Sequence, residues 1–186
     1  TATAEHLVFI ASEVVEPEPT ATPIPVEAVA PDVVRKGPQD VESVETLLLE
    51  HGYYRDDVPL PYELQGFLRD ACEESGVPYP LALAVIQAET QFRNVVGDDG
   101  ASQGYMQVQQ RWHHDRMERL GVTDLMDPAG NFRVGCDYLA ELLETYDSVD
   151  LAVTVYNWGH NPGYITTYGL KVMGYYEDWK ELLGDA

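Results

Sequence analysis

Basic residues are scarce in this sequence of 186 residues, which holds 11 lysines and arginines against 32 aspartates and glutamates, for a net charge of −21. Binding to nucleic acid and docking on anionic lipid both need clustered positive charge, so the balance argues against both. No apolar run approaches the roughly 20 residues that span a bilayer. The chain starts at Thr1 with no signal peptide, so we expect any membrane anchor to lie upstream of it.

Cysteine is also rare, since the chain contains only Cys72 and Cys136. Two cysteines are too few for a disulfide scaffold or for a metal site made of cysteines alone. One interpretation is a pair of small buried residues on helices. The other is a single bridge between two helices, which requires a compartment outside the reducing cytosol.

Large aromatic residues and glycine are almost absent from residues 1–50, where Phe9 and Gly37 are the only examples. The same segment holds six of the twelve prolines and ten acidic residues. Proline fixes φ and removes a backbone donor, so the stretch 16–25 predicts an extended linker. The apolar residues 7–10 could still dock on a domain or add a short strand. We expect residues 1–50 to be an acidic, proline-rich N-terminal segment.

The sequence after residue 50 has the composition of a folded domain. All three tryptophans and all twelve tyrosines lie there, and large aromatic side chains supply much of the area that a core buries. Apolar residues repeat at helical spacing, so residues 51–186 are predicted to form one all-α domain. The helices are predicted over 61–75, 80–89, 111–120, 128–143, 151–156 and 175–183, with a loop or a short β-hairpin over 94–104.

Glu89 is the most informative acidic residue. It follows a run of eight residues, 81–88, in which Gln87 is the one polar side chain. On a helix Glu89 shares a face with apolar members of that run, so its carboxyl group is desolvated. Desolvation raises the pKa, and a carboxylic acid that stays protonated near neutral pH suits general-acid catalysis. The structural alternative is a salt bridge to Arg93 or Arg133, or a helix that ends at the surface.

Three blocks of residues follow one another in a fixed order from Glu89 onward. Each block is a weak signal alone, but the three in register are specific, and Gln107 lies eighteen positions after Glu89. Across residues 62–180 the pattern resembles the lytic transglycosylases of the SLT type. The blocks are Glu89-Thr90-Gln91-Phe92, then Gly104-Tyr105-Met106-Gln107, then Asp127-Pro128, Asn131-Phe132, Gly135, Tyr138-Leu139 and Val155-Tyr156-Asn157-Trp158-Gly159.

The resemblance implies a lysozyme-like fold and an enzyme that cleaves the glycan strands of peptidoglycan. The bond would be the β-1,4 link from N-acetylmuramic acid to N-acetylglucosamine. Glu89 would protonate the leaving oxygen and then accept the proton of the muramyl 6-hydroxyl, which attacks within the same sugar to give a 1,6-anhydro product. The resemblance implies no cofactor. It places the protein outside the cytoplasm at the cell wall, membrane-tethered, secreted or in an envelope-spanning complex.

The resemblance also assigns substrate-binding residues in the second block and just before it. Gln107 and Ser102 would line the cleft and hydrogen-bond the acetamido groups or the loop. Tyr105 stands where leucine is usual and adds aromatic surface, which suits stacking on a sugar ring or packing in a core. Met106 would pack under the site.

The third block supplies two further residues to the expected site. Tyr156 would place its hydroxyl near Glu89 and orient the carboxyl group or the sugar. Asn157 would hydrogen-bond a neighbouring backbone turn as well as serve the site. Trp158 replaces a small residue of the family pattern, and the sequence of residues 160–164 also differs from that pattern. The resemblance therefore does not specify the shape of the saccharide groove.

His113 and His114 raise the question of a metal site. Neighbouring residues on a helix point about 100° apart, and Glu118 is the one acidic residue at helical spacing from either histidine. Two ligands do not make a site. We therefore expect no metal ion, and we expect surface histidines beside a core Trp112.

Three alternatives to the transglycosylase remain open. A goose-type muramidase would hydrolyse the same bond, but it needs a second carboxylate to hold water. Asp98 and Asp99 are available for this, although they lie in a turn-rich loop. A catalytically silent module would keep the groove and bind peptidoglycan without cleaving it. A structural scaffold in a secretion or conjugation complex would use residues 1–50 as its working part.

Overall fold

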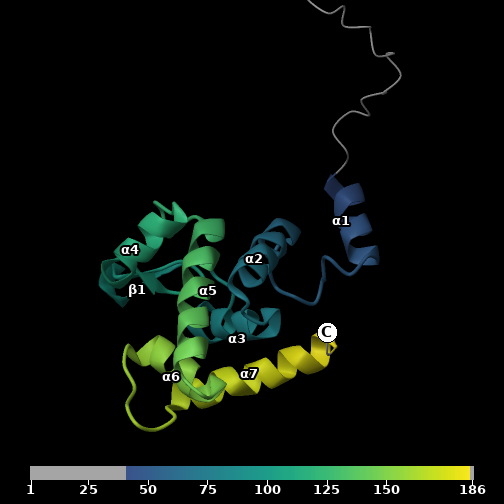
Figure 1. Ribbon diagram of the computed structural model, residues 1–186. Helices are drawn as coiled ribbons and strands as arrows, with labels where there is room; N and C mark the ends of the chain where they lie inside the picture. The colour runs from purple at the N-terminus through teal and green to yellow at the C-terminus, as the bar shows by residue number, and fades with distance from the viewer. Residues whose placement is uncertain (1–40, 185–186) are drawn as a thin grey trace, which may run out of the picture. The chain divides into compact units, whose positions relative to one another are not determined.

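The computed structural model of the chain describes residues 41–184, with side chains from residue 46 on (Figure 1). The linker expected over residues 1–50 therefore lies outside the described residues up to residue 40, as do the apolar residues 7–10. The remaining part forms a helix, α1 (Val41–Glu50), that the sequence analysis did not predict. Pro38 is the last proline of the segment, so no later residue of it lacks the backbone donor that a helix needs.

The described residues are mainly helical, which confirms the predicted fold class. Two helix ends follow the sequence signals closely. Gly76 ends α2 in the left-handed conformation at φ 76°, which favours glycine. The Asp127 side chain caps α5 by accepting a hydrogen bond from the Gly130 amide at 2.9 Å. The helices after α1 are α2 (Tyr62–Ser75), α3 (Tyr79–Thr90), α4 (Gln110–Leu120), α5 (Pro128–Thr145), α6 (Val149–Trp158) and α7 (Thr167–Leu183).

A small antiparallel sheet lies between α3 and α4 in the sequence, where a loop or short hairpin was expected. Its order is β1-β2-β3, and each strand has two residues. A 3-10 turn over Asp98–Gly100 joins β1 to β2. The strands are β1 (Val96–Gly97), β2 (Ser102–Gln103) and β3 (Val108–Gln109).

Helix α3 is the most deeply buried element of the described residues. Residues 81–86 on it are all 0% exposed, so this helix lacks a polar face and is packed on several sides. It lies between α2 and α7, while α5 packs against α2 and α6 (Figure 1). The helix reaches the surface at its two ends, and its last turn holds Glu89.

Both cysteines are buried free thiols on helices, Cys72 on α2 and Cys136 on α5. This arrangement agrees with the first of the two interpretations from the sequence. The two side chains are in hydrogen-bonding contact where α2 packs on α5, and this contact together with burial raises the pKa of the Cys136 thiol.

The expected arrangement around the paired histidines is wrong, because Trp112 is 73% exposed and His113 is the residue that packs inward. The His113 ring lies 4.6 Å from the Tyr138 ring, and burial lowers the pKa of His113 to about 4. Helix α4 is interrupted at His113, where φ is −122° and ψ is 18°, so the helical register used for the prediction does not continue through it. Residues 41–184 contain no cluster of histidine, cysteine and acidic side chains suited to a metal ion, nor a helix with the length and apolar character to cross a bilayer.

Candidate functional site

Glu89 is half-buried in the last turn of α3 and is held by a residue from the other end of the domain sequence. The Tyr168 hydroxyl on α7 donates a hydrogen bond to Glu89 Oε1 at 2.6 Å. A second bond fixes the same helix pair, since Trp179 Nε1 donates to Gln87 Oε1 at 2.8 Å. The packing of α7 on α3 therefore sets the position of the carboxyl group.

The surroundings of Glu89 favour its protonated form. Burial raises the pKa of this carboxyl group above its usual value, because desolvation penalises the anion. The hydrogen bond from Tyr168 and the charge of Lys171 oppose this rise, the charge of Asp98 adds to it, and a hydrogen bond from Asn157 opposes it more weakly. Burial has the largest effect, so Glu89 keeps its proton to a higher pH than an exposed glutamate does.

The structural alternative of a salt bridge to Glu89 is not realised among the described residues. Arg93 donates through Nε to a backbone carbonyl at the end of α3, at 3.0 Å. Arg133 pairs with Glu74 at 3.0 Å. The cation that acts on Glu89 is Lys171, and its Nζ donates to a backbone carbonyl of α3 at 2.9 Å. The Glu89 carboxyl group thus has hydrogen-bond donors beside it and no paired arginine.

The loop over residues 103–107 passes close to Glu89 and is anchored by three helices. Thr90 on α3 donates through its hydroxyl to the Tyr105 carbonyl at 3.0 Å. Tyr156 on α6 donates to the Met106 carbonyl at 2.9 Å, and Asn131 on α5 accepts from the Met106 amide at 2.9 Å. The wall of the site is therefore built from backbone that side chains of α3, α5 and α6 hold in place.

Three of the predicted substrate-binding residues are covered by protein. Met106 is 0% exposed and Ser102 2% exposed. Tyr105 is 9% exposed, with its ring 5.3 Å from the Phe132 ring. The Ser102 hydroxyl donates to the Asp98 carboxylate. These side chains build the support of the loop, and the structure does not bring them to the surface beside Glu89.

Gln107 is half-buried and its side chain serves the loop. Its amide nitrogen donates to the Val95 carbonyl at 3.0 Å and to the Gly104 carbonyl at 2.8 Å. A Cβ atom at Gly97 would overlap Gln107 Oε1, so a larger residue at that point of β1 would push the end of the Gln107 side chain aside. Of the two roles expected for Gln107, the contacts within the loop are present.

The end of α6 brings Tyr156 and Asn157 to the Glu89 side of the domain. The Tyr156 hydroxyl donates to the Met106 carbonyl. Burial raises the pKa of Tyr156 well above its usual value, and the negative charge of Glu89 raises it further. Asn157 is exposed and acts on Glu89 by hydrogen bonding. Trp158, the next residue, is 49% exposed at the end of the helix.

Sequence reasoning missed two residues that hold this site, Tyr168 and Asn131. Tyr168 lies beyond the third sequence block, and no spacing rule connects it to Glu89. Asn131 was noted as a member of that block without a role, yet it is 0% exposed and its amide donates to the Gln103 carbonyl at 2.9 Å. A polar residue on the otherwise apolar face of α5, directly before Phe132, was the available signal.

Comparison with known proteins identifies a family and solved structures of similar fold. The family model for the transglycosylase SLT domain matches residues 67–164. The fold is similar to that of an inactive mutant of the lytic transglycosylase Slt from Pseudomonas aeruginosa, with a TM-score of 0.56 and 18% sequence identity. The alignment covers 73% of this chain and 27% of that one, so this chain spans about a quarter of the length of the solved protein. The residues matched by the family model include Glu89 and all three sequence blocks.

Proposed function

Because the chain belongs to the transglycosylase SLT domain family, whose members are lytic transglycosylases acting on peptidoglycan, we propose that Glu89 is the general acid and base of such an enzyme. The bond cleaved is the β-1,4 link between N-acetylmuramic acid and N-acetylglucosamine. The observation that supports this most directly is the half-buried Glu89 carboxyl group, whose pKa is raised by burial and which accepts a hydrogen bond from Tyr168 at 2.6 Å.

The reaction needs one carboxyl group used twice. Protonated Glu89 gives its proton to the glycosidic oxygen as the bond from that oxygen to the muramyl anomeric carbon breaks. The Glu89 carboxylate then takes the proton from the muramyl 6-hydroxyl as its oxygen bonds to the same carbon. The product is a 1,6-anhydro end, and no water is consumed. The Tyr168 hydroxyl stabilises the anion between the two steps by donating to it.

The other residues near Glu89 divide into contacting and supporting groups. We expect Asn157, which is exposed, to meet the acetamido groups of the glycan, and Gln107, which is half-buried with its amide nitrogen on the loop, to reach them through its remaining amide oxygen. Tyr156 supports the wall of the site through the Met106 carbonyl. The glycan is the partner of this site, which puts the protein at the cell wall, outside the cytoplasm.

Hydrolysis of the same bond is the second candidate, and Asp98 is the observation that favours it. Asp98 is exposed, and its carboxylate is held by Ser102 and by Gln109 Nε2 at 3.3 Å. It is also the acidic residue whose charge raises the pKa of Glu89. A carboxylate fixed in this way could hold an attacking water molecule.

Product analysis separates the two reactions. The protein is incubated with purified sacculi of several wall types, and the released muropeptides are identified by mass spectrometry. We expect 1,6-anhydro-muramyl ends, and the Asp98→Asn variant should form them as the unchanged protein does. Hydrated reducing ends that disappear in Asp98→Asn would contradict the proposal in favour of hydrolysis. Binding to sacculi without any release would indicate the silent module instead.

A further inference from the structure

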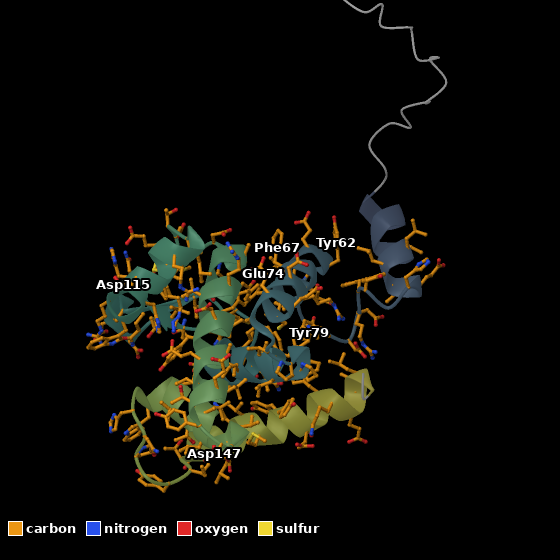
Figure 2. The ribbon with its side chains drawn as sticks, in the orientation of Figure 1. Tyr62, Phe67, Glu74, Tyr79, Asp115 and Asp147 are labelled. Carbon is orange, nitrogen blue, oxygen red and sulfur yellow. The ribbon has the colours of Figure 1, made fainter. Side chains whose placement is uncertain are left out.

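A cavity of about 630 Å³ lies at the opposite end of α3 from Glu89. This volume is within the range of about 300–1,000 Å³ that small-ligand sites occupy. Tyr79 lines the cavity at the first position of α3, ten residues before Glu89, so the two lie about 15 Å apart along the helix. Its walls come from α1, α2 and the start of α3, and Figure 2 shows two of its aromatic side chains, Tyr62 and Tyr79, at the N-terminal ends of α2 and α3.

Arg69 in the wall of this cavity is the exception among the arginines of residues 41–184. Its guanidinium carbon lies 4.2 Å from the centre of the Tyr79 ring, but it forms no hydrogen bond or ion pair with the described residues. An arginine without an anion is unexpected in a chain with 32 acidic residues. Every other arginine in this range donates a hydrogen bond: Arg55, Arg93, Arg111, Arg116, Arg119 and Arg133.

Two buried donors in the cavity wall have no acceptor. In residues 41–184, Arg69 Nε and the Tyr79 hydroxyl are two of three buried side-chain atoms without a hydrogen-bond partner. The third, Arg116 Nε, has the Asp137 carboxylate 3.1 Å away. Burial raises the pKa of Tyr79 to about 12, so its hydroxyl keeps its proton. Unpaired buried donors are costly, and both of these lack the same thing, an oxygen acceptor.

Acidic side chains stand at the edge of the same cavity. Asp70 and Glu73 line it, are exposed and form no ion pair within the described residues. Glu73 lies one helical turn after Arg69, at a spacing that commonly allows a salt bridge, yet the two do not pair. The cavity therefore offers an unneutralised cation and buried donors within, and carboxylates at its edge. A ligand with a carboxylate and an amine matches both.

We propose that this cavity binds short peptides through a free carboxylate, which Arg69 and Tyr79 receive. The guanidinium fork donates to both oxygens of a carboxylate, and a turn of the Arg69 side chain toward the cavity gives Nε the acceptor that it lacks. Asp70 and Glu73 meet an amine of the same ligand, and Leu48 and Val77 supply apolar wall for small side chains. Peptidoglycan stem peptides carry carboxylates, an amine and alanine methyl groups, and naming them as the ligand rests on the proposed function.

Titration calorimetry of the full chain with a synthetic stem tetrapeptide tests this inference. We expect saturable binding that is weakened more than tenfold when the carboxyl groups of the peptide are amidated. Arg69→Ala should weaken it to the same extent, and Tyr79→Phe, which removes one oxygen and keeps the ring, should weaken it several-fold. Arg119→Ala is the matched control, because it removes an arginine paired with Asp137, and it should bind as the unchanged protein does.

The outcomes separate this site from the one at Glu89. Glu89→Gln should bind the peptide normally while losing turnover of sacculi. Absence of saturable binding by the full chain, or equal binding by Arg69→Ala or by the amidated peptide, overturns the inference. If the peptide binds through Arg69 while sacculi release no product, the proposed function fails and the carboxylate site stands, with peptides of another source as its ligand.

Discussion

The polar groups at the two ends of α3 differ in whether they have hydrogen-bond partners. At the C-terminal end the Glu89 carboxyl group has its donor in place, with Tyr168 at 2.6 Å. At the N-terminal end the donors of Arg69 and Tyr79 are buried with no acceptor in the described residues. Helix α3, 0% exposed over residues 81–86, carries Glu89 and Tyr79, and Arg69 comes from the neighbouring helix α2. The difference indicates that one end is complete in the free protein and the other needs a ligand to become complete.

Glu89→Gln should give the largest effect, because it removes the proton donor of the complete end and keeps the shape of the side chain. Turnover of sacculi should fall by about 10²- to 10⁴-fold, the usual contribution of general acid-base catalysis. Release of soluble muropeptides measures this. The control is Glu144→Gln on the exposed side of α5, which should keep full turnover, and retention of turnover by Glu89→Gln would refute the assignment.

The same variant has a predicted effect on stability that depends on pH. The folded protein raises the pKa of Glu89, so the stability from its protonated form is present at low pH and is lost as pH rises through the folded pKa. Glu89→Gln should therefore melt a few degrees above the unchanged protein at alkaline pH. The difference should vanish near pH 4, the usual pKa of a free glutamate. Thermal unfolding followed by circular dichroism across this range checks the sign.

Asn131→Ala should weaken the support of the loop beside Glu89 and leave the cavity at Arg69 and Tyr79 unchanged. It leaves the Met106 amide and the Gln103 carbonyl without their buried partner, so the free energy of unfolding should drop by about 3 kcal/mol. Urea denaturation measures the change. Asn94→Ala removes a single exposed hydrogen bond and should cost less than about 1 kcal/mol. A loss of similar size in both variants would show that the loop does not depend on Asn131.

Tyr168→Phe should have a smaller effect on catalysis than loss of the carboxyl group. The hydroxyl stabilises the Glu89 anion, and its removal should slow turnover about tenfold, as expected for one charge-assisted hydrogen bond. Because this bond lowers the pKa of Glu89, its loss should move the alkaline limb of the rate profile to higher pH. Tyr175→Phe, on the same helix, should leave the profile unchanged. A limb that moves to lower pH would contradict the role given to Tyr168.

Tyr79→Phe should have the smallest effect on stability. It tests the difference between the unpaired Tyr79 hydroxyl and the hydrogen-bonded Tyr168 hydroxyl directly. It removes a buried hydroxyl that has no acceptor, so the free energy of unfolding should stay the same or rise by up to about 1 kcal/mol. Tyr168→Phe, which removes a hydroxyl that is hydrogen-bonded, should lower it. Urea denaturation of the two variants side by side gives the comparison. A clear loss of stability in Tyr79→Phe would mean that the hydroxyl already has a partner.

The sequence predicts those parts of the fold that depend on local signals. Helices α2 and α5 follow from apolar spacing with a glycine end and an aspartate-proline start. Helix α7 was predicted from residue 175 but begins at Thr167. Gly169 and Gly174 and the exposed Leu170 break the apolar pattern of its first half. The missed signal was Thr166, whose side chain caps the helix by accepting from the Gly169 amide at 3.2 Å.

The candidate site divides in the same way. The unusual environment of Glu89 could be predicted because an apolar helix desolvates it wherever the rest of the chain lies. The role of Tyr168 could not be predicted, because its hydrogen bond to Glu89 depends on the packing of α7 against α3, and the two residues lie 79 positions apart in the sequence. Met106 was expected to pack under the site and is buried, and Tyr105, which could have stacked on a sugar ring or packed in the core, is buried as well. Which side of a loop turns inward is decided by distant anchors such as Asn131, and no local pattern shows it.

The anchoring of residues 103–107 by Thr90, Asn131 and Tyr156 has a consequence for how ligands are received. Since side chains from α3, α5 and α6 hold this backbone, the wall next to Glu89 is preorganised in the free protein. Association then loses little chain entropy in ordering that wall. The Met106 amide proton, which is bonded to the buried Asn131 side chain, should exchange with solvent only when the helix bundle opens, so the rigidity of the wall depends on the whole domain.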